Sequence, residues 1–201
     1  SYANPSRTTV DQYGNCWVGN RQSAAAVKIG LFEAGQYEDR NHNGVIDTSR
    51  DLNNDGSITG AEELPWGQDE CVLRELILIP GNLGTYVPGT YAGAYANDYW
   101  NPGPRGVAID EQNNLWIGAY GSMKYYYVHG LSGTILRTVD VAPLGHHPYG
   151  AVIDANGILW SASWTDAGGD GNLLRMDPRT DAIREIDLAL PTYGMGLDTQ
   201  G

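Results

Sequence analysis

The sequence predicts an all-β fold, a β-propeller built from four-stranded blades. One observation is a repeat in which an apolar triplet precedes Asp and a turn rich in Asn or Gly follows it. Another is its period, because Asp110, Asp154 and Asp198 lie 44 residues apart, a spacing typical of one propeller blade. The third is that Asp11 opens the same pattern 99 residues before Asp110, so the first unit carries extra sequence. We therefore expect about three blades and the first strand of a fourth.

Each unit begins with a strand, a tight turn and a second strand. The apolar triplets 107–109 and 151–153 are expected to form inner strands, and the turns after them contain residues that tolerate positive φ. Trp17, Trp116 and Trp160 follow their Asp residues by six positions and begin the second strands. We expect these rings to pack between neighbouring blades, because stacked sheets bury large apolar side chains against one another.

Third and fourth strands are expected after each Trp. They fall at 25–32 and 71–79 in the first unit, 124–129 and 134–139 in the second, and 172–176 and 182–186 in the third. The wide gap in the first unit predicts an insertion within its outer hairpin. The expected organisation is propeller blades at 1–37 and 71–201 with an inserted cassette at 38–70.

The cassette contains two calcium-loop patterns of the EF-hand type, DRNHNGVIDTSR and DLNNDGSITGAE. Calcium takes about 6–8 oxygen ligands, which such a loop supplies from positions 1, 3, 5, 7, 9 and 12, with Gly at position 6. The expected ligands are Asp39, Asn41, Asn43, Val45 and Asp47 in the first loop, and Asp51, Asn53, Asp55, Ser57, Thr59 and Glu62 in the second. Ca²⁺ is therefore the expected cofactor.

The first loop departs from the pattern at position 12, where Arg50 replaces the acid. Asp51, one residue later, is a candidate to serve both loops. The tandem arrangement leaves no room for flanking helices, so a paired helix–loop–helix is not expected. The cassette resembles dockerin-type and thrombospondin type 3 calcium loops, which implies a structural role for the metal. The alternative is an acidic Asn/Gly turn without metal, since these residues also favour turns.

The charge of the chain is concentrated in this cassette. The net charge is −12, and segment 38–70 holds nine acids against Arg40 and Arg50. This acidity argues against a nucleic-acid partner, which needs a basic face. No apolar run reaches the ~18 residues of a membrane helix. No signal peptide is recognisable either, so a mature or partial chain is expected.

The two cysteines, Cys16 and Cys71, are candidates for a disulfide that ties the cassette to the blades. The alternative is a pair of buried free thiols. A disulfide requires an oxidising compartment, and calcium sites of moderate affinity fill best outside the cell. The expected location is therefore secreted or at the cell surface.

The long loop at 80–104 is rich in Gly, Pro and Tyr, and it exceeds the length of a passive connector. It is expected either to cover an apolar face or to form a binding surface for sugar rings. Its aromatic residues are Tyr86, Tyr91, Tyr95, Tyr99 and Trp100.

The repeat P-x-G-x-x-x-D-x-x-G-N-x-W resembles the NHL and streptogramin-lyase-like β-propellers. Such propellers have more blades, about six or seven. We therefore expect a fragment, a partly resolved chain or an assembly in which chains complete one another. The lyase branch implies a histidine near the channel mouth that acts with a divalent metal in a β-elimination opening a cyclic peptide ester. His146 and His147 are the candidates here. The alternative is that both are ordinary loop residues.

Three functions follow from these features. The leading expectation is an extracellular, calcium-stabilised and non-catalytic module that binds a protein or glycan, self-association included. The second is a structural subunit of an extracellular fibre or surface layer, because exposed blade faces pair between chains. The third is a metal-dependent lyase of the streptogramin type. No GxSxG, HExxH, P-loop or Rossmann fingerprint occurs in the sequence.

Overall fold

The computed structural model describes residues 4–97, 103–164, 171–188, 190 and 192–198. These residues form three antiparallel sheets, and the helical elements among them are short 3₁₀ turns at Phe32–Ala34, Gly60–Glu62 and Ala142–Leu144. None of these turns is long or apolar enough to cross a membrane. The expectation of an all-β protein is confirmed.

Each sheet is a meander in which consecutive strands are neighbours. The first sheet contains β1 (Pro5–Val10), β2 (Cys16–Asn20), β3 (Ala25–Ile29), β4 (Val72–Ile77) and β5 (Gly84–Tyr86). The second contains β6 (Pro104–Ile109), β7 (Leu115–Ala119), β8 (Lys124–Val128) and β9 (Ile135–Asp140). The third contains β10 (Pro148–Ile153), β11 (Leu159–Ser163), β12 (Asn172–Asp177) and β13 (Ala182–Asp187).

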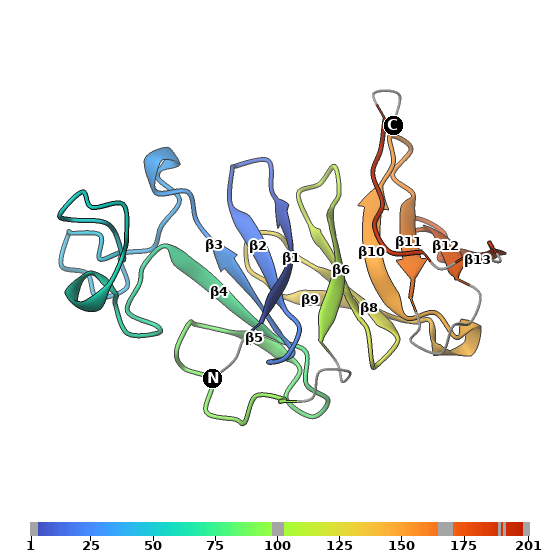
Figure 1. Cartoon of the computed structure of the whole chain (residues 1–201), viewed down its shortest axis with the longest axis horizontal. Coiled ribbons are helices and arrows are strands. Elements are labelled where there is room, and N and C mark those ends of the chain that lie inside the picture. The colour runs from blue at the N-terminus through green and yellow to red at the C-terminus, as the bar shows by residue number, and fades with distance from the viewer. Residues whose placement is uncertain (1–3, 98–102, 165–170, 189, 191, 199–201) are drawn as a thin grey trace.

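The three sheets follow one another as successive propeller blades do. Strand β6 contacts β1 on one side and β10 on the other, so the first strands of the sheets form the inner side of the stack. Figure 1 shows the sheets in chain order from left to right. The arrangement is propeller-like, and closure into a ring and the total blade number stay predictions.

Two apolar clusters join the sheets, and the repeated Trp residues lie within them. Trp17 belongs to the cluster between the first and second sheets, and Trp116 to the cluster between the second and third; both side chains are 0% exposed. Trp160, at the same place in the third sheet, is only partly buried, and its Nε1 donates to Asp154 Oδ2 at 2.8 Å. The prediction that these rings pack between neighbouring sheets is confirmed for the first two.

The repeated Asp residues cap the turns between the first two strands of each sheet. In the second sheet, one carboxylate oxygen of Asp110 accepts the backbone N–H groups of Gln112 and Asn114 at 3.0 and 2.8 Å. Asp11 and Asp154 accept equivalent bonds in the first and third sheets. This bonding holds the turn closed because a short carboxylate reaches the N–H groups two and four residues later.

The first sheet differs from the expected four strands. Residues of the 80–104 loop form β5, which pairs with β4 through Leu76 and Thr85 and makes this sheet five-stranded. The sequence did not predict this strand because it is three residues long and begins with Gly84. The expected strand that opens a fourth unit is also absent from the described residues 192–198, which have no regular structure.

The expected disulfide is wrong, since Cys16 and Cys71 are free thiols. Strand β3 lies between them: Cys16 on β2 pairs with Ile29, and Ile29 pairs with Val72 on β4. Two strand spacings amount to about 9.6 Å, beyond the roughly 7 Å across which a disulfide reaches. Burial raises the pKa of both thiols, which makes them poor nucleophiles.

Candidate metal centre

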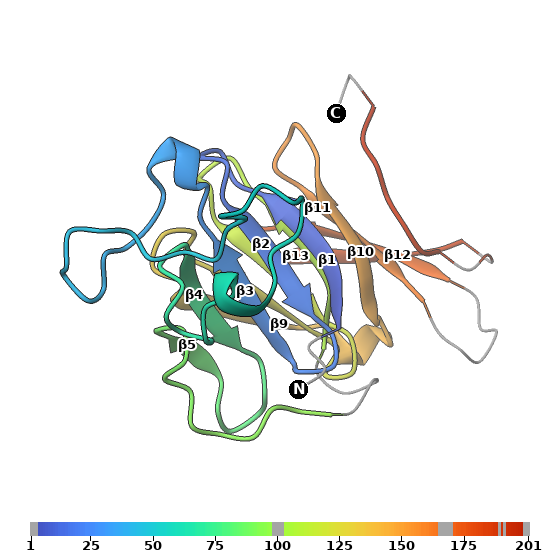
Figure 2. The same cartoon turned by 60° about the vertical axis from the view of Figure 1, so that its left-hand side comes forward.

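The cassette leaves the first sheet after β3 and returns to it at β4. These strands are antiparallel neighbours although residues 30–71 separate them, so the cassette enters the sheet as part of an outer hairpin. It projects from the far end of the stack, away from β6 and β10, as the cyan and teal segment at the left of Figure 1. Figure 2, turned by 60°, shows the teal part of this segment in front of the first sheet and another part that extends to the left beyond it.

The second loop has the internal bonds expected of its sequence. The carboxylate of Asp51, at position 1, accepts the N–H of Gly56 at 2.8 Å. Asn53 Oδ1 accepts the N–H of Asp55, and Asp55 Oδ1 accepts the N–H of Ser57, both at 2.8 Å. These bonds close the loop through side-chain oxygens of positions 1, 3 and 5.

Glu62 closes the second loop. Its two carboxylate oxygens accept backbone N–H groups from Leu52, Asn53 and Thr59. The bonds from Leu52 and Thr59 hold the pKa of Glu62 below its usual value. The position-12 carboxylate therefore reaches across the loop to its start.

The first loop is folded in the same way over its first seven positions. Asp39 Oδ2 accepts the N–H of Gly44 at 3.0 Å. Asn41 Oδ1 accepts the N–H of Asn43 at 2.9 Å, and Asn43 Oδ1 accepts the N–H of Val45 at 2.7 Å. At positions 4 and 6 both loops adopt positive φ, with values of 57° and 76° in the first loop and 60° and 85° in the second. The two loops thus share the bonds accepted by positions 1, 3 and 5 and the positive φ at positions 4 and 6.

The residues present suit a cation that takes mixed oxygen ligands. Within the described ranges, no group of three His, Cys, Asp or Glu side chains is placed to hold a metal ion. Calcium loops also use amide and backbone oxygens, which such a group does not include. Asp39 Oδ1 is shielded from solvent and accepts no hydrogen bond. A buried, unpaired carboxylate oxygen at position 1 is costly without a cation.

Two residues of this region had no role in the sequence predictions. Glu70 follows the second loop and is 2% exposed, yet its side chain lies in the first loop. Trp66 is 53% exposed and lines an apolar groove on the outer face of the first sheet. No spacing rule points to either residue, because each acts through a contact that the fold creates.

The groove at Trp66 has a volume of about 440 Å³. Its floor is made of apolar side chains on β2 and β3, among them Val18, Val27 and Ile29, and Tyr95 lies at its wall. Glu75 of β4, which is 2% exposed, accepts hydrogen bonds from the Tyr95 hydroxyl and from Trp66 Nε1. One carboxylate thus ties the cassette and the 80–104 loop to the sheet.

The described aromatic residues of the 80–104 loop pack on each other rather than in a flat row. Tyr91 lies edge-to-face with Tyr86 and Tyr95, at centroid distances of 5.0 and 5.1 Å. Tyr99 and Trp100 lie outside the described residues. Through Tyr95 the loop lies beside the apolar face of the first sheet, in agreement with the covering role among the two expected roles.

His146 is placed as a buried structural residue. It is 0% exposed, and its ring nitrogens lie 2.7 Å from Asn172 Oδ1 and 2.7 Å from Ser161 Oγ. Burial lowers the pKa of His146 to about 4. A side chain whose two nitrogens are both engaged inside the protein has none free to take a proton from a substrate.

His147 is half-buried, and its ring packs on Tyr120 at a centroid distance of 4.9 Å. Its Nδ1 lies 3.2 Å from the carbonyl oxygen of Tyr120, which makes Nδ1 the protonated nitrogen. Arg105 lies over the same Tyr120 ring at 5.0 Å. The described contacts of His147 are thus the hydroxyl of Ser163 and the carbonyl oxygen and ring of Tyr120.

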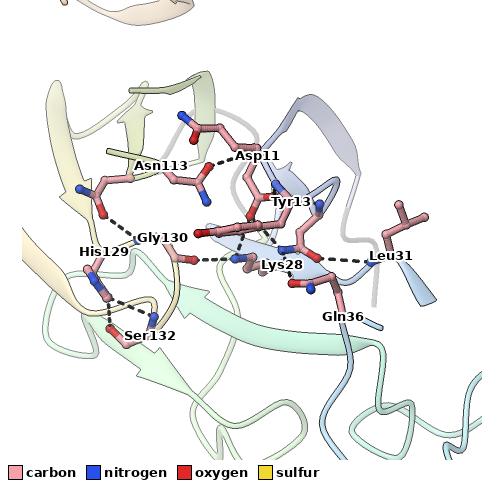
Figure 3. Close-up of polar contacts among 12 residues, drawn as sticks. Asp11, Tyr13, Lys28, Leu31, Gln36, Asn113, His129, Gly130 and Ser132 are labelled. Carbon is pink, nitrogen blue, oxygen red and sulfur yellow. Dashed lines mark hydrogen bonds and ion pairs between the residues drawn. The ribbon is translucent and has the colours of Figure 1, made fainter. Parts of the chain in front are cut away.

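A buried ion pair of the first sheet is hydrogen-bonded to the second sheet through Lys28 (Figure 3). Lys28 Nζ lies 2.9 Å from Asp11 Oδ2, and it donates to the carbonyl oxygen of Gly130, after β8, at 2.6 Å. Both side chains are at most 2% exposed. Burial alone would raise the pKa of Asp11, but hydrogen bonds from Asn15 and Lys28 and the charge of Lys28 outweigh it and lower the pKa. The pair thus lies within the first sheet, and Lys28 links it to the second sheet through Gly130.

The comparisons with known proteins concern the fold. No protein-family model and no curated protein matches the sequence. Similar solved structures include a hydrazine synthase from Kuenenia stuttgartiensis, with a TM-score of 0.56 and 11% identity over 96% of this chain and 39% of that chain. A virginiamycin B lyase from Staphylococcus aureus has a TM-score of 0.47 and 17% identity over 98% of this chain and 60% of that chain. Regucalcin from Agrobacterium tumefaciens, a calcium-binding protein, has a TM-score of 0.36 and 14% identity over 91% and 74%.

The lyase and regucalcin are β-propellers. At these identities a likeness shows fold alone, and the two TM-scores below 0.5 support no shared activity or ligand. The chain spans 39% and 60% of the first two proteins' chains. The likeness of the cassette to dockerin-type loops rests on the sequence alone.

Proposed function

We propose that this chain is a calcium-braced β-propeller segment that acts as a non-catalytic binding module. The observation that carries the proposal is that two loops with calcium-ligand sequences share one internal hydrogen-bond scheme in a cassette that has no apolar core. Calcium binding to these loops orders the segment that presents Trp66 at the groove. Millimolar calcium fills sites of moderate affinity outside cells, which supports a secreted or cell-surface location.

The groove is the proposed binding surface, and its geometry favours a protein that presents a β-sheet face. Strands β2 and β3 of the first sheet correspond to β7 and β8 of the second, with Trp17 on β2 in the place of Trp116 on β7. By this match Val18, Val27 and Ile29 of the groove floor correspond to Ile117, Tyr126 and Val128, which pack against the first sheet. The groove floor therefore repeats a surface that, one sheet further on, is covered by another sheet. A glycan would meet few polar groups on this floor.

Calcium binding is tested by thermal unfolding of the chain with millimolar calcium and with excess EGTA, and by calorimetric titration. The expected result is binding of two calcium ions and a higher melting temperature in calcium, because a ligand that binds only the folded state stabilises it. Unchanged melting together with no heat of binding would contradict the proposal.

The binding surface is tested by sedimentation of the calcium-loaded chain over a range of concentrations, with a second copy as the protein that carries a sheet face. Self-association that Val18→Arg abolishes would support the groove as the interface. Val10→Arg is the matched control, because Val10 is 61% exposed and absent from the groove. Association that survives Val18→Arg would place the interface elsewhere.

A further inference from the structure

We propose that Glu70 is the position-12 ligand of the first calcium loop, supplied from beyond the second loop in the sequence. The inference deepens the proposed function and rests on it, because it assigns a ligand to one of the two calcium sites. It also replaces Asp51 as the residue expected to complete the first loop.

The carboxylate of Glu62 shows what a position-12 acid does in this cassette. Its Oε1 accepts the N–H groups of positions 2 and 3, Leu52 at 2.8 Å and Asn53 at 3.2 Å. Its Oε2 accepts the N–H of position 9, Thr59, at 3.3 Å. The carboxylate thus spans the loop from its entry to its exit.

The carboxylate of Glu70 does the same in the first loop, position for position. Its Oε1 accepts the N–H groups of positions 2 and 3, Arg40 at 2.7 Å and Asn41 at 3.3 Å. Its Oε2 accepts the N–H of position 9, Asp47, at 3.1 Å. The same oxygen atoms therefore serve the same three loop positions in both sites.

The backbone of the two acids is placed alike as well. The N–H of Glu70 donates to the carbonyl oxygen of Asp47 at 2.8 Å, and the N–H of Glu62 donates to that of Thr59 at 3.2 Å. Each acid thus bonds to position 9 of its own loop. Glu62 follows position 9 by 3 residues, whereas Glu70 follows it by 23. The second loop is inserted in the chain between Asp47 and Glu70. This insertion explains why the first loop has no acid at its position 12 in the sequence.

The charge at this site points to a cation. Glu70 is 2% exposed, and among the described residues no Lys or Arg forms a salt bridge with it. Asp39, at position 1 of the same loop, has a carboxylate oxygen that is shielded from solvent and accepts no hydrogen bond. Two carboxylates of one loop, one buried and one with a buried unpaired oxygen, lack a counter-charge that a divalent ion would supply.

Neither residue near position 12 of the first loop takes this place. Arg50 is exposed. The two carboxylate oxygens of Asp51 accept the N–H groups of Asp55 and Gly56, within the second loop. Asp51 therefore belongs to its own loop.

The test is a calorimetric calcium titration of the wild-type chain and of Glu70→Gln, which keeps the size of the side chain and removes its charge. The wild type is expected to bind two ions, and Glu70→Gln is expected to weaken one site at least about tenfold and spare the other. Glu62→Gln is the matched control and should weaken the other site. Arg50→Gln should change neither.

The outcomes separate this inference from the proposed function. A wild type that binds no calcium contradicts the calcium proposal as a whole. A wild type that binds two ions while Glu70→Gln keeps both affinities overturns the role of Glu70 alone. If Glu70→Gln does not fold, the carboxyl ¹³C resonance of Glu70 in the wild type is followed during calcium titration. Movement together with the Asp39 carboxyl supports the assignment, and a static Glu70 signal overturns it.

Discussion

The stacked sheets and the cassette are stabilised in different ways. The sheets enclose two apolar clusters with fully buried Trp17 and Trp116. In the cassette, all of whose residues 38–70 are described, the one buried residue is the acid Glu70. Four of its larger apolar side chains are exposed, namely Val45 at 59%, Leu52 at 62%, Ile58 at 44% and Trp66 at 53%. A segment without an apolar core depends on hydrogen bonds and, as proposed, on metal.

This difference shows that two parts of one chain can be stabilised by different interactions. Burial of apolar surface stabilises the sheets whether or not calcium is present. The cassette instead concentrates negative charge, which opposes its own folding unless a cation neutralises it. Changes in the sheets should therefore have large effects that calcium does not alter, whereas changes in the cassette should matter through calcium.

The largest effect is expected for Trp17→Ala in the core. Loss of a fully buried indole should lower the free energy of unfolding by about 4–5 kcal/mol, equally in calcium and in EGTA. The matched cassette variant, Trp66→Ala, removes a half-exposed ring and should cost less than about 1 kcal/mol. Urea unfolding of both variants measures the contrast. Similar losses for the two would show that the cassette shares the core of the sheets.

A slightly smaller effect is expected for Lys28→Met, which leaves Asp11 buried without its cation. Breaking a buried ion pair on one side costs about 3–4 kcal/mol, because an uncompensated charge remains inside the protein. The double variant Asp11→Asn with Lys28→Met should recover part of that loss. Chemical denaturation of the single and double variants measures it. A single variant as stable as the wild type would mean that the pair contributes nothing to the stability of the fold.

The sequence predicted the sheets better than the site. The period of Asp and Trp placed nearly every strand, because alternating apolar residues and turn chemistry are local signals. It missed β5 and the separation of Cys16 from Cys71, since both depend on which strands become neighbours. In the cassette, the sequence indicated the ligands of the first loop as far as position 9. It did not indicate Glu70, because only the folded path of the chain brings this residue to Asp47.

An effect no larger than that of Lys28→Met concerns pH and is confined to the third sheet. His146 has a pKa lowered to about 4 in the folded state against 6.5 ordinarily, so the unfolded chain binds more protons between these values. Stability should therefore fall as the pH drops from 6.5 to about 4, by up to about 3 kcal/mol. Unfolding measured across this range in the wild type and in His146→Gln isolates the contribution. An unchanged slope in the variant would mean that His146 does not cause it.

The most direct test of the account is amide hydrogen exchange of the whole chain with calcium and with EGTA. We predict that removal of calcium speeds exchange within 38–70, most of all at the N–H groups of Arg40, Asn41, Leu52 and Asn53 that bond to Glu70 and Glu62. Exchange in β2, β7 and β11 should stay slow in both conditions. Equal protection of the cassette with and without calcium would contradict the account, as would loss of protection in the sheets.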